Sequence, residues 1–295
     1  MLVYIDDIVI FGKSFILLEE RLREVFNRLR KANLKLKPSK VKLFQTEITF
    51  LGHIVSREGI AMDPEKIKEV VEWQPPHNVH EVRQFLGLCS YYRKFVKNFS
   101  LLAAPLHELT RKEEAFVWTD DRQEAFERLK NNLVTGSILA MSTENGEFVL
   151  DVDASNWAAG AVLQQEQEGQ LRVIGYASRT FDKCEIRYCI TRKELAALIF
   201  GLKHYRQYVL GRKFRLRSDH AALRYLRSAT ELIGQQGRWL ATLEEFDFKL
   251  DHRAGLLHGN ADSMSRKTPC EEGGSHAPSV QSGDRLKISQ MKISL

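Results

Sequence analysis

The sequence lacks any apolar stretch near the roughly 18 residues that a membrane-spanning helix requires. Its opening, MLVYIDD, also lacks the positively charged region and small-residue cleavage site of a signal peptide. The four cysteines are scattered without CxxC spacing, a pattern typical of reduced thiols and not of a disulfide framework. Together these absences predict a cytoplasmic or nuclear protein.

A strong excess of one charge is absent too, because the net charge is only +6. Two basic clusters nevertheless stand out, LRKANLKLKPSKVK and YYRKFVKNF, and the second interleaves Lys and Arg with aromatic residues. Such a mixture suits phosphate backbones and stacked bases. A solvated basic face is the alternative interpretation. The 295 residues suffice for one large core and more readily for two.

The first half of the chain predicts helices and one hairpin. Apolar residues recur at helical spacing between residues 18 and 32, with Ser14 placed as the N-cap. Short apolar runs around Gly52 and Gly59 predict a hairpin over residues 50–60. Further helices are predicted after Asp63-Pro64, where Pro takes the first helical position, over residues 79–96, and over residues 120–133.

From Gly146 onward the pattern changes to that of an α/β domain. Three short β-prone runs come first, then a long amphipathic helix over residues 190–211, and then two more strands, KFRLRSD and FDFKLDHR. Meandering strands followed by helices alternating with strands predict a mixed sheet. The residues from Lys267 are polar, rich in Gly and Ser and without apolar periodicity, so we expect a disordered tail.

Carboxylates at element ends are the chemical signal of this second half, namely Asp153, Glu194, Asp219 and Asp262. If the strands are adjacent, these side chains meet at one edge of the sheet. Four carboxylates in one place repel each other unless cations hold them. Hard oxygen ligands suit Mg²⁺, and two ions about 4 Å apart form the usual clamp for phosphodiester hydrolysis. Asp residues at strand ends are also common in domains without any metal, which is the alternative.

Eight segments carry a resemblance to a known family. They are, in order, YIDDIVIF, ANLKLKPSK, FLGHIVSREGI, VRQFLGLCSYYRKFVKNFS, VLDVDAS, GYASR, LRSDHAALRYL and HGNADSMSR. Over about residues 2–266 the chain resembles the Pol polyprotein of gypsy-type LTR retrotransposons. The resemblance implies an α/β (α+β) protein with a truncated reverse transcriptase palm and thumb and a ribonuclease H-like mixed-sheet domain. The implied divisions are a palm remnant (1–56), thumb and connection (57–140), ribonuclease H (141–266) and a tail (267–295).

The paired aspartates of YIDD gain a meaning from this resemblance. A lone Asp-Asp pair would be an ordinary turn, but the family implies that Asp6 and Asp7 are catalytic, metal-binding carboxylates at the tip of the palm hairpin. It also implies that FLGH is the primer grip. The fingers and the first palm strand, with the third catalytic aspartate, would lie before Met1. We therefore expect polymerase activity to be lost and the hairpin to lack its neighbouring strands.

The ribonuclease H part is expected to be complete. Asp153, Glu194, Asp219 and Asp262 each match, in order, the metal-binding carboxylates of the family, which implies two Mg²⁺ or Mn²⁺ ions. Asp151, two residues earlier on the same strand face, does not match and is interpreted as structural. His252 stands where gypsy-type sequences commonly have an aromatic residue, whereas retroviral ribonucleases H place a histidine that assists product release at a similar distance from the last aspartate.

The resemblance implies membership of the RNA-directed DNA polymerase family and an endonuclease activity that cuts RNA in RNA–DNA hybrids. The partners that it implies are the RNA–DNA hybrid, primer-template nucleic acid and other Pol segments. The alternative is a co-opted Pol remnant that only binds nucleic acid, through basic residues such as Lys35, Lys37, Arg93 and Lys94. A decayed gene product that does not fold is the third. Intact carboxylates favour the nuclease, because a pure binder does not need all four.

Overall fold

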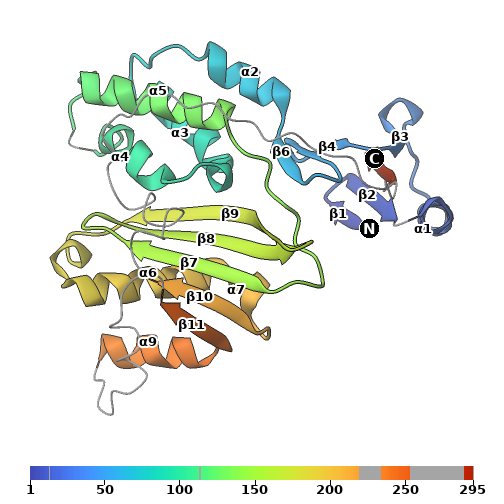
Figure 1. The fold of residues 1–295 in the computed structure, drawn as a ribbon. Coiled ribbons are helices and arrows are strands. Elements are labelled where there is room, and N and C mark those ends of the chain that lie inside the picture. The colour runs from blue at the N-terminus through green and yellow to red at the C-terminus, as the bar shows by residue number, and fades with distance from the viewer. Residues whose placement is uncertain (13, 113, 219–233, 253–288, 295) are drawn as a thin grey trace. The chain divides into compact units, whose positions relative to one another are not determined.

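The computed structural model describes every residue except 13, 113, 219–233, 253–288 and 295 (Figure 1). The described chain forms two compact units. The first contains residues 1–66 and the C-terminal strand, and the second contains residues 67–252.

A four-stranded antiparallel sheet organises the first unit. Its strands are β1 (Leu2–Tyr4), β2 (Asp7–Gly12), β12 (Ser289–Ser294) and β3 (Lys42–Gln45), in that spatial order. The strand beside the β1–β2 hairpin therefore comes from the far end of the sequence. This corrects two expectations. The hairpin is not without a neighbour on the β2 side, and residues 289–294 of the predicted disordered tail form a strand.

Helix α1 (Phe15–Lys31) covers this sheet, as its periodicity predicts. Ser14 is its N-cap, with the Leu17 N–H donating to Ser14 Oγ at 3.3 Å. The buried core of the unit joins two strand residues to one face of the helix: Ile8, Ile10, Leu18, Leu22, Val25 and Leu29. After the 3₁₀ turn η1 (Pro38–Lys40), a small antiparallel sheet consists of β4 (Ile48–Phe50), β5 (His53–Val55) and β6 (Ile60–Met62). The predicted hairpin is thus confirmed as part of a three-stranded meander.

Helix α2 (Pro64–Glu72) spans the boundary between residues 66 and 67. The helical part of the second unit continues with α3 (Val79–Tyr91), η2 (Arg93–Phe95), α4 (Phe99–Glu108) and α5 (Asp120–Val134). Helix α3 ends earlier than predicted. Helix α4 was not predicted, because its continuous apolar run and internal Pro105 are poor helix signals. Phe85 and Tyr92 are buried and belong to the core.

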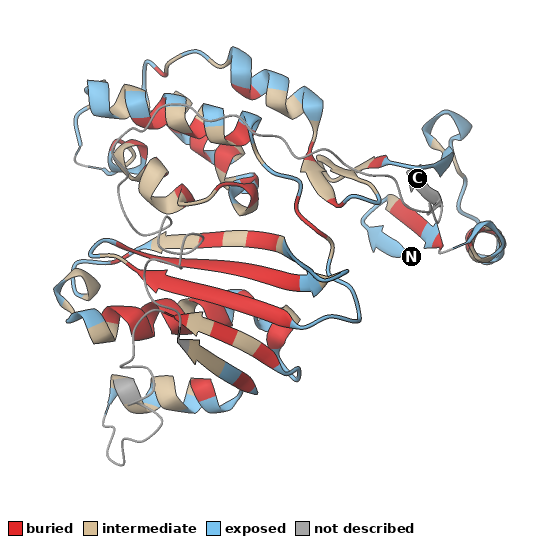
Figure 2. Cartoon of the chain, viewed as in Figure 1, coloured by how far each residue is buried: buried red, intermediate tan, exposed pale blue. Residues whose placement is uncertain are grey.

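The second sheet is mixed, as the sequence predicts. Its strands are β7 (Phe148–Ala154), β8 (Ala158–Gln167), β9 (Gln170–Thr180), β10 (Phe214–Ser218) and β11 (Phe248–His252). Their spatial order is β11-β10-β7-β8-β9. The β7, β8 and β9 strands form an antiparallel meander, and β10 runs parallel to both β7 and β11. The central strand β7 is buried along its whole length (Figure 2).

Helix α6 (Ile190–His204) packs on β7 and β8, and is followed by α7 (Arg206–Val209) and α9 (Gln235–Glu244). The approach is close at Gly201, where an added Cβ would stand 2.8 Å from Val152 Cγ1 and 3.6 Å from Leu150 Cδ2. These two residues of β7 therefore face the helix. Since side chains alternate along a strand, Asp151 and Asp153 lie on the other face.

The helices before the sheet pack with it in the same unit. Helix α4 contacts β9, and the Ser100 N–H donates to Ser178 Oγ at 2.9 Å. The predicted boundary between residues 140 and 141 thus falls inside one compact unit. Within the described ranges, no helix is long and apolar enough to cross a membrane.

Candidate functional site

Asp153 lies near the end of the central strand β7 and is only 3% exposed. Its antiparallel partner on β8 is Gly160. Residues that stand opposite each other share a face of the sheet, so the position beside this carboxylate carries no side chain. A buried carboxylate costs free energy unless it is hydrogen-bonded, paired or bound to a metal. The strand therefore holds a buried carboxylate, an oxygen donor of the type that hard cations prefer.

Asp151 shares the strand and the face but has a different environment. Arg217 on the parallel neighbour β10 stands opposite it, and Arg217 Nη1 is 3.7 Å from Asp151 Oδ1. The Asp151 side chain is fully buried and the Arg217 side chain is largely buried. The ion pair joins two central strands, in agreement with the structural role that the sequence predicts for Asp151.

Glu194 lies one turn into α6 and is 3% exposed. Its chain neighbour Lys193 is also buried, and Lys193 Nζ donates to Asn156 Oδ1 at 3.2 Å. Asn156 belongs to the short loop that follows Asp153 on β7. This hydrogen bond ties the start of α6 to the end of the strand that carries the predicted ligand.

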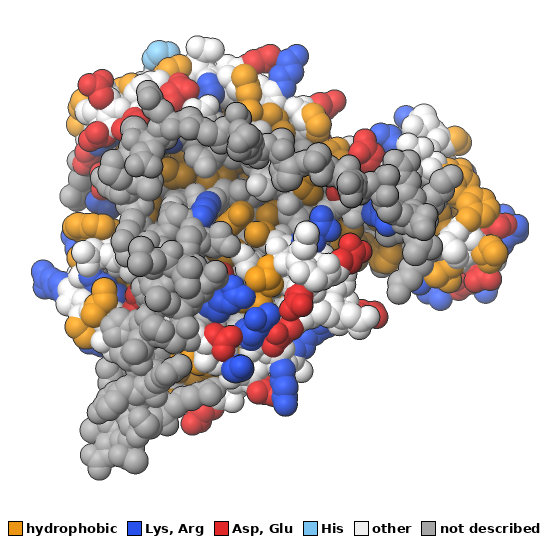
Figure 3. All heavy atoms as spheres, viewed as in Figure 1, with side chains coloured by type: hydrophobic (Ala, Val, Ile, Leu, Met, Phe, Trp, Pro, Cys, Tyr) orange, Lys and Arg blue, Asp and Glu red, His pale blue; other side chains and the backbone are white. Residues whose placement is uncertain are grey.

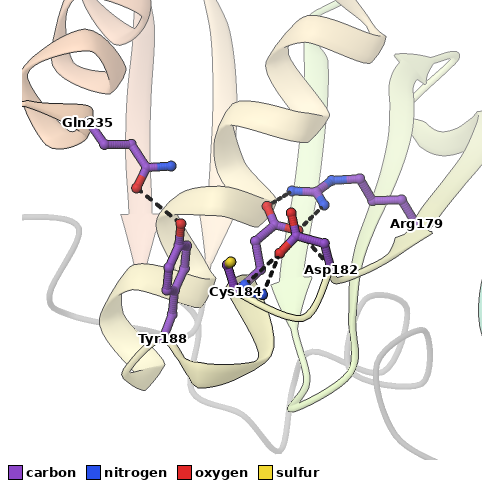
Figure 4. Close-up of polar contacts among 6 residues, drawn as sticks. Arg179, Asp182, Cys184, Tyr188 and Gln235 are labelled. Atoms are coloured by element: carbon purple, nitrogen blue, oxygen red, sulfur yellow. Dashed lines mark hydrogen bonds and ion pairs between the residues drawn. The ribbon is translucent and has the colours of Figure 1, made fainter.

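The turn between β9 and α6 is built around an ion pair (Figure 4). Arg179 Nη1 and Nη2 donate to Glu185 Oε2 and Oε1 at 2.6 and 2.7 Å. The Arg179 hydrogen bonds hold the pKa of Glu185 below its ordinary value. Asp182 Oδ1 accepts from the N–H groups of Cys184 and Glu185, both at 2.8 Å. The segment leading into α6 is thereby given a defined path.

A second set of contacts joins the start of α6 to α9. Tyr188 Oη donates to Gln235 Oε1 at 3.2 Å (Figure 4), and Arg192 donates to the same oxygen. The Arg192 guanidinium carbon lies 3.9 Å from the centre of the Tyr188 ring. Trp239 of α9 meets that ring edge-on. These contacts anchor the first turn of α6, and with it the backbone at Glu194.

Asp219 and Asp262 lie outside the described residues. Ser218, the residue before Asp219, is buried at the end of β10. His252 is the last residue of β11, opposite Ser218. In the part of the chain that the structure describes, no group of three or more Asp, Glu, His or Cys residues could hold a metal ion. Asp153 and Glu194 are nonetheless buried oxygen donors, the ligand type that Mg²⁺ prefers, and so fit such an ion as part of a larger set.

Asp6 and Asp7 belong to the other unit. Tyr4 pairs with Asp7, so Ile5 and Asp6 form the two-residue turn of the β1–β2 hairpin. The predicted position at a hairpin tip is confirmed, and the catalytic role stays a prediction. Ile5 has a φ of 52° and is 81% exposed. A positive φ is unfavourable for a β-branched residue, and such strain is found most often at functional sites.

The predicted nucleic-acid contacts differ in accessibility. Lys35, Lys37 and Arg93 are exposed, as is Lys40. Lys94 is half-buried and lies over the Phe95 ring, and burial lowers its pKa; the same holds for the pKa of half-buried Lys97. Among the described side chains drawn in Figure 3, basic ones stand beside acidic ones. In the predicted primer grip, His53 Nδ1 lies 2.6 Å from the Leu51 carbonyl oxygen.

Sequence reasoning did not single out Lys193 and Trp157. Trp157 follows the strand of Asp153 by three residues and is 59% exposed. Ser155 Oγ accepts from the N–H groups of Trp157 and Ala158, each at 3.0 Å, which shapes the loop. The available signal was an aromatic residue inside a Ser-Asn turn directly after a strand. Exposure of that residue was visible only in the structure.

Comparison with known proteins agrees with this arrangement. Residues 143–246 match the family model "RNase H-like domain found in reverse transcriptase", and residues 1–55 match "Reverse transcriptase (RNA-dependent DNA polymerase)". The chain is 37% identical over 265 residues to the retrovirus-related Pol polyprotein from transposon 412 of Drosophila melanogaster and 39% identical over 270 residues to that from transposon 297. It is 33% identical over 268 residues to the transposon Tf2-3 polyprotein of Schizosaccharomyces pombe.

These alignments cover 90%, 90% and 89% of the chain but only 21%, 25% and 20% of the respective relatives. Among solved structures, the fold is similar to the foamy viral protease-reverse transcriptase in complex with RNA/DNA hybrid, with a TM-score of 0.71 at 22% identity. That match covers 88% of this chain and 36% of the other. The complex with dsDNA has a TM-score of 0.67 at 24% identity, covering 79% and 51%.

Proposed function

Since this chain is a reverse transcriptase and ribonuclease H-like region homologous to the Pol polyproteins of LTR retrotransposons, mostly of the gypsy type, we propose that residues 142–266 cut the RNA strand of an RNA–DNA hybrid. The observation that carries the proposal is the burial of Asp153 and Glu194, on a central strand and on the helix packed against that strand. Buried carboxylates are oxygen donors of the type that Mg²⁺ prefers, so their presence at these two positions supports a metal-binding role.

The proposed ligands of two Mg²⁺ or Mn²⁺ ions are Asp153, Glu194, Asp219 and Asp262. When bound, such ions supply an activated water and stabilise the leaving oxygen in phosphodiester hydrolysis. The residues of the chain contribute positioning. The Asp151–Arg217 pair fixes β7 against β10, and the Lys193–Asn156 hydrogen bond fixes α6 against the loop after β7. These two contacts position the strand that carries Asp153 and the helix that carries Glu194 before any substrate binds, and a hydrolytic site requires such positioning.

The proposed substrate is recognised through its backbone. A hybrid duplex offers phosphates and 2′-hydroxyl groups, so binding should depend on salt and little on base sequence. Trp157 offers an exposed aromatic surface three residues after the β7 strand. The solved foamy viral relative with an RNA/DNA hybrid supports a nucleic-acid partner of this kind.

The test is the Asp153→Asn substitution in the whole 295-residue chain, assayed on a labelled hybrid with Mg²⁺ or Mn²⁺. Even the partners of metal ligands contribute about 10- to 100-fold to metal affinity or activity, so we expect cleavage to fall by at least about 100-fold. Asp151→Asn is the matched control, with the same chemical change on the same strand face. It should lower the melting temperature by breaking the Arg217 pair and leave cleavage measurable.

Equal cleavage by wild type and Asp153→Asn would contradict the proposal. Absence of cleavage in the wild type, together with salt-dependent hybrid binding, would instead support the nucleic-acid-binding role. The exposed basic residues Lys35, Lys37, Lys40 and Arg93 favour that second role.

For the polymerase motif we propose a narrower role. Asp6 and Asp7 supply two carboxylates at a hairpin tip, whereas nucleotidyl transfer needs metals, triphosphate and primer end positioned together. Whatever accompanies these residues in a longer protein, we expect the 295-residue polypeptide alone not to extend a primer.

A further inference from the structure

The sheet of the first unit has an unusual connectivity, because the strand in its interior is the last one in the sequence. Strand β2 pairs with β1 on one side and with β12 on the other, and β3 pairs with β12 (Figure 1). No pairing joins β2 to β3 directly. Residues 1–66 by themselves thus leave a gap one strand wide, which residues 289–294 fill.

In the pairing register of β12 with β2, apolar residues of β12 stand opposite buried residues of β2. Ile8 and Ile10 of β2 are 6% and 0% exposed, and Ile293 and Met291 stand at the register positions opposite them. Polar residues alternate with these two positions in the strand SQMKIS. A slip of one residue would place Lys292 opposite Ile8 or Ile10, so the alternation specifies a single register.

We propose that the gap between β2 and β3 is a binding site for an extended polypeptide strand, and that residues 289–294 of this chain are its occupant. The ligand class is an extended segment with apolar residues at alternate positions, bound by main-chain hydrogen bonds to two strand edges. An empty gap would leave two rows of main-chain N–H and C=O groups without sheet partners. The sheet that carries Asp6 and Asp7 is therefore completed by the C-terminal end of the same polypeptide.

One substitution and a matched control test whether residues 289–294 occupy the gap. Met291→Lys introduces a charge at the position opposite Ile10, which is fully buried. Gln290→Lys introduces the same residue opposite Phe11, which is 38% exposed. By hydrogen exchange on the full chain, amides of residues 8–11 should exchange at least about tenfold faster in Met291→Lys than in wild type or Gln290→Lys. Amides of β7 and β8 should be unchanged.

Adding the strand from outside tests the binding site itself. A fluorescent peptide with the sequence of residues 287–295 should bind the Met291→Lys chain at least about tenfold more tightly than the wild-type chain. The reason is that the covalently attached strand competes at a high effective concentration only in the wild type. The peptide should also restore slow exchange at residues 8–11, and a peptide that itself carries Met291→Lys should do neither.

Three outcomes would overturn the proposal. Equal peptide binding by wild type and Met291→Lys would mean that residues 289–294 do not occupy the gap. Fast exchange in Met291→Lys that the peptide cannot reverse would mean that the gap is not a binding site for a separate strand. A wild-type dimer that Met291→Lys converts to monomer would assign the occupant to a second copy and would overturn occupation by the same chain. None of these outcomes bears on hybrid cleavage by the second unit.

Discussion

The two units present predicted catalytic carboxylates in opposite ways. In the first unit, Asp6 lies exposed in a hairpin turn whose neighbour Ile5 is 81% exposed. In the second, Asp153 and Glu194 are each 3% exposed, on a central strand and on the helix that covers the sheet. The second unit builds its described sheet and helices from one continuous part of the chain, whereas the first needs a strand from the far end. Asp153 and Glu194 are enclosed by packed elements, whereas Asp6 lies in a turn open to solvent, and packed surroundings are what hold functional side chains in a fixed geometry.

The largest expected effect separates the two hydrophobic cores. Leu150 and Ile10 are both fully buried, one in each unit. Replacing either by Ala should lower the free energy of unfolding of its own unit by about 2–5 kcal/mol, because a cavity is left behind. Regional hydrogen exchange should show Leu150→Ala accelerating exchange in β7 and β8 only, and Ile10→Ala in β2 and α1 only. Acceleration in both units by either substitution would show that the units unfold together.

A smaller effect tests how closely α6 approaches the sheet. An added methyl group at Gly201 would stand 2.8 Å from Val152 Cγ1 and 3.3 Å from Ala161 Cβ. Gly201→Ala should therefore destabilise the second unit by about 1–3 kcal/mol despite the better helix propensity of Ala. Gly87→Ala in α3 is the matched control, since nothing lies within 4 Å of its added Cβ.

At Gly87 the propensity gain of about 0.5–1 kcal/mol should appear as stabilisation. Urea unfolding followed by a fluorescence signal measures both variants. Stabilisation by both substitutions would mean that α6 moves away from β7 at little cost.

The smallest expected effect concerns pH and the turn between β9 and α6. Bonding to Arg179 lowers the pKa of Glu185 in the folded chain below its ordinary value of 4.5. The stabilisation is therefore complete above that ordinary value and is lost as the pH falls through the lower folded pKa. Glu185→Gln should cost about 1 kcal/mol at pH 7 and progressively less at acidic pH.

Melting temperatures of wild type and Glu185→Gln between pH 7 and pH 3 measure this difference. Glu19→Gln is the control in the first unit, because the Glu19–Arg23 pair on α1 is largely exposed and should contribute little at any pH. A constant difference between wild type and Glu185→Gln over this range would contradict the assignment of the ion pair.

Much of the fold could be predicted from local patterns. The Ser14 cap, the apolar face of α1 and the meander of β7, β8 and β9 follow from spacing along short segments, and the structure confirms each one. Helix α4 escaped prediction because its sequence lacks an amphipathic pattern. The mixed sheet was predicted from the order of the elements, since a strand that follows a crossover helix can pair parallel to an earlier strand of the sheet.

The sequence by itself determined which residues could carry the chemistry, because carboxylate identity and motif order are properties of the chain. Only the tertiary structure decided how they differ in environment. Asp151 and Asp153 have the same residue type, strand and face, and the Arg217 ion pair of Asp151 depends on a parallel strand more than 60 residues later. The placement of residues 289–294 beside β2 was equally inaccessible, because their composition predicts disorder. Local propensity describes a segment in isolation, whereas pairing in a sheet depends on which strand edges the rest of the chain leaves open.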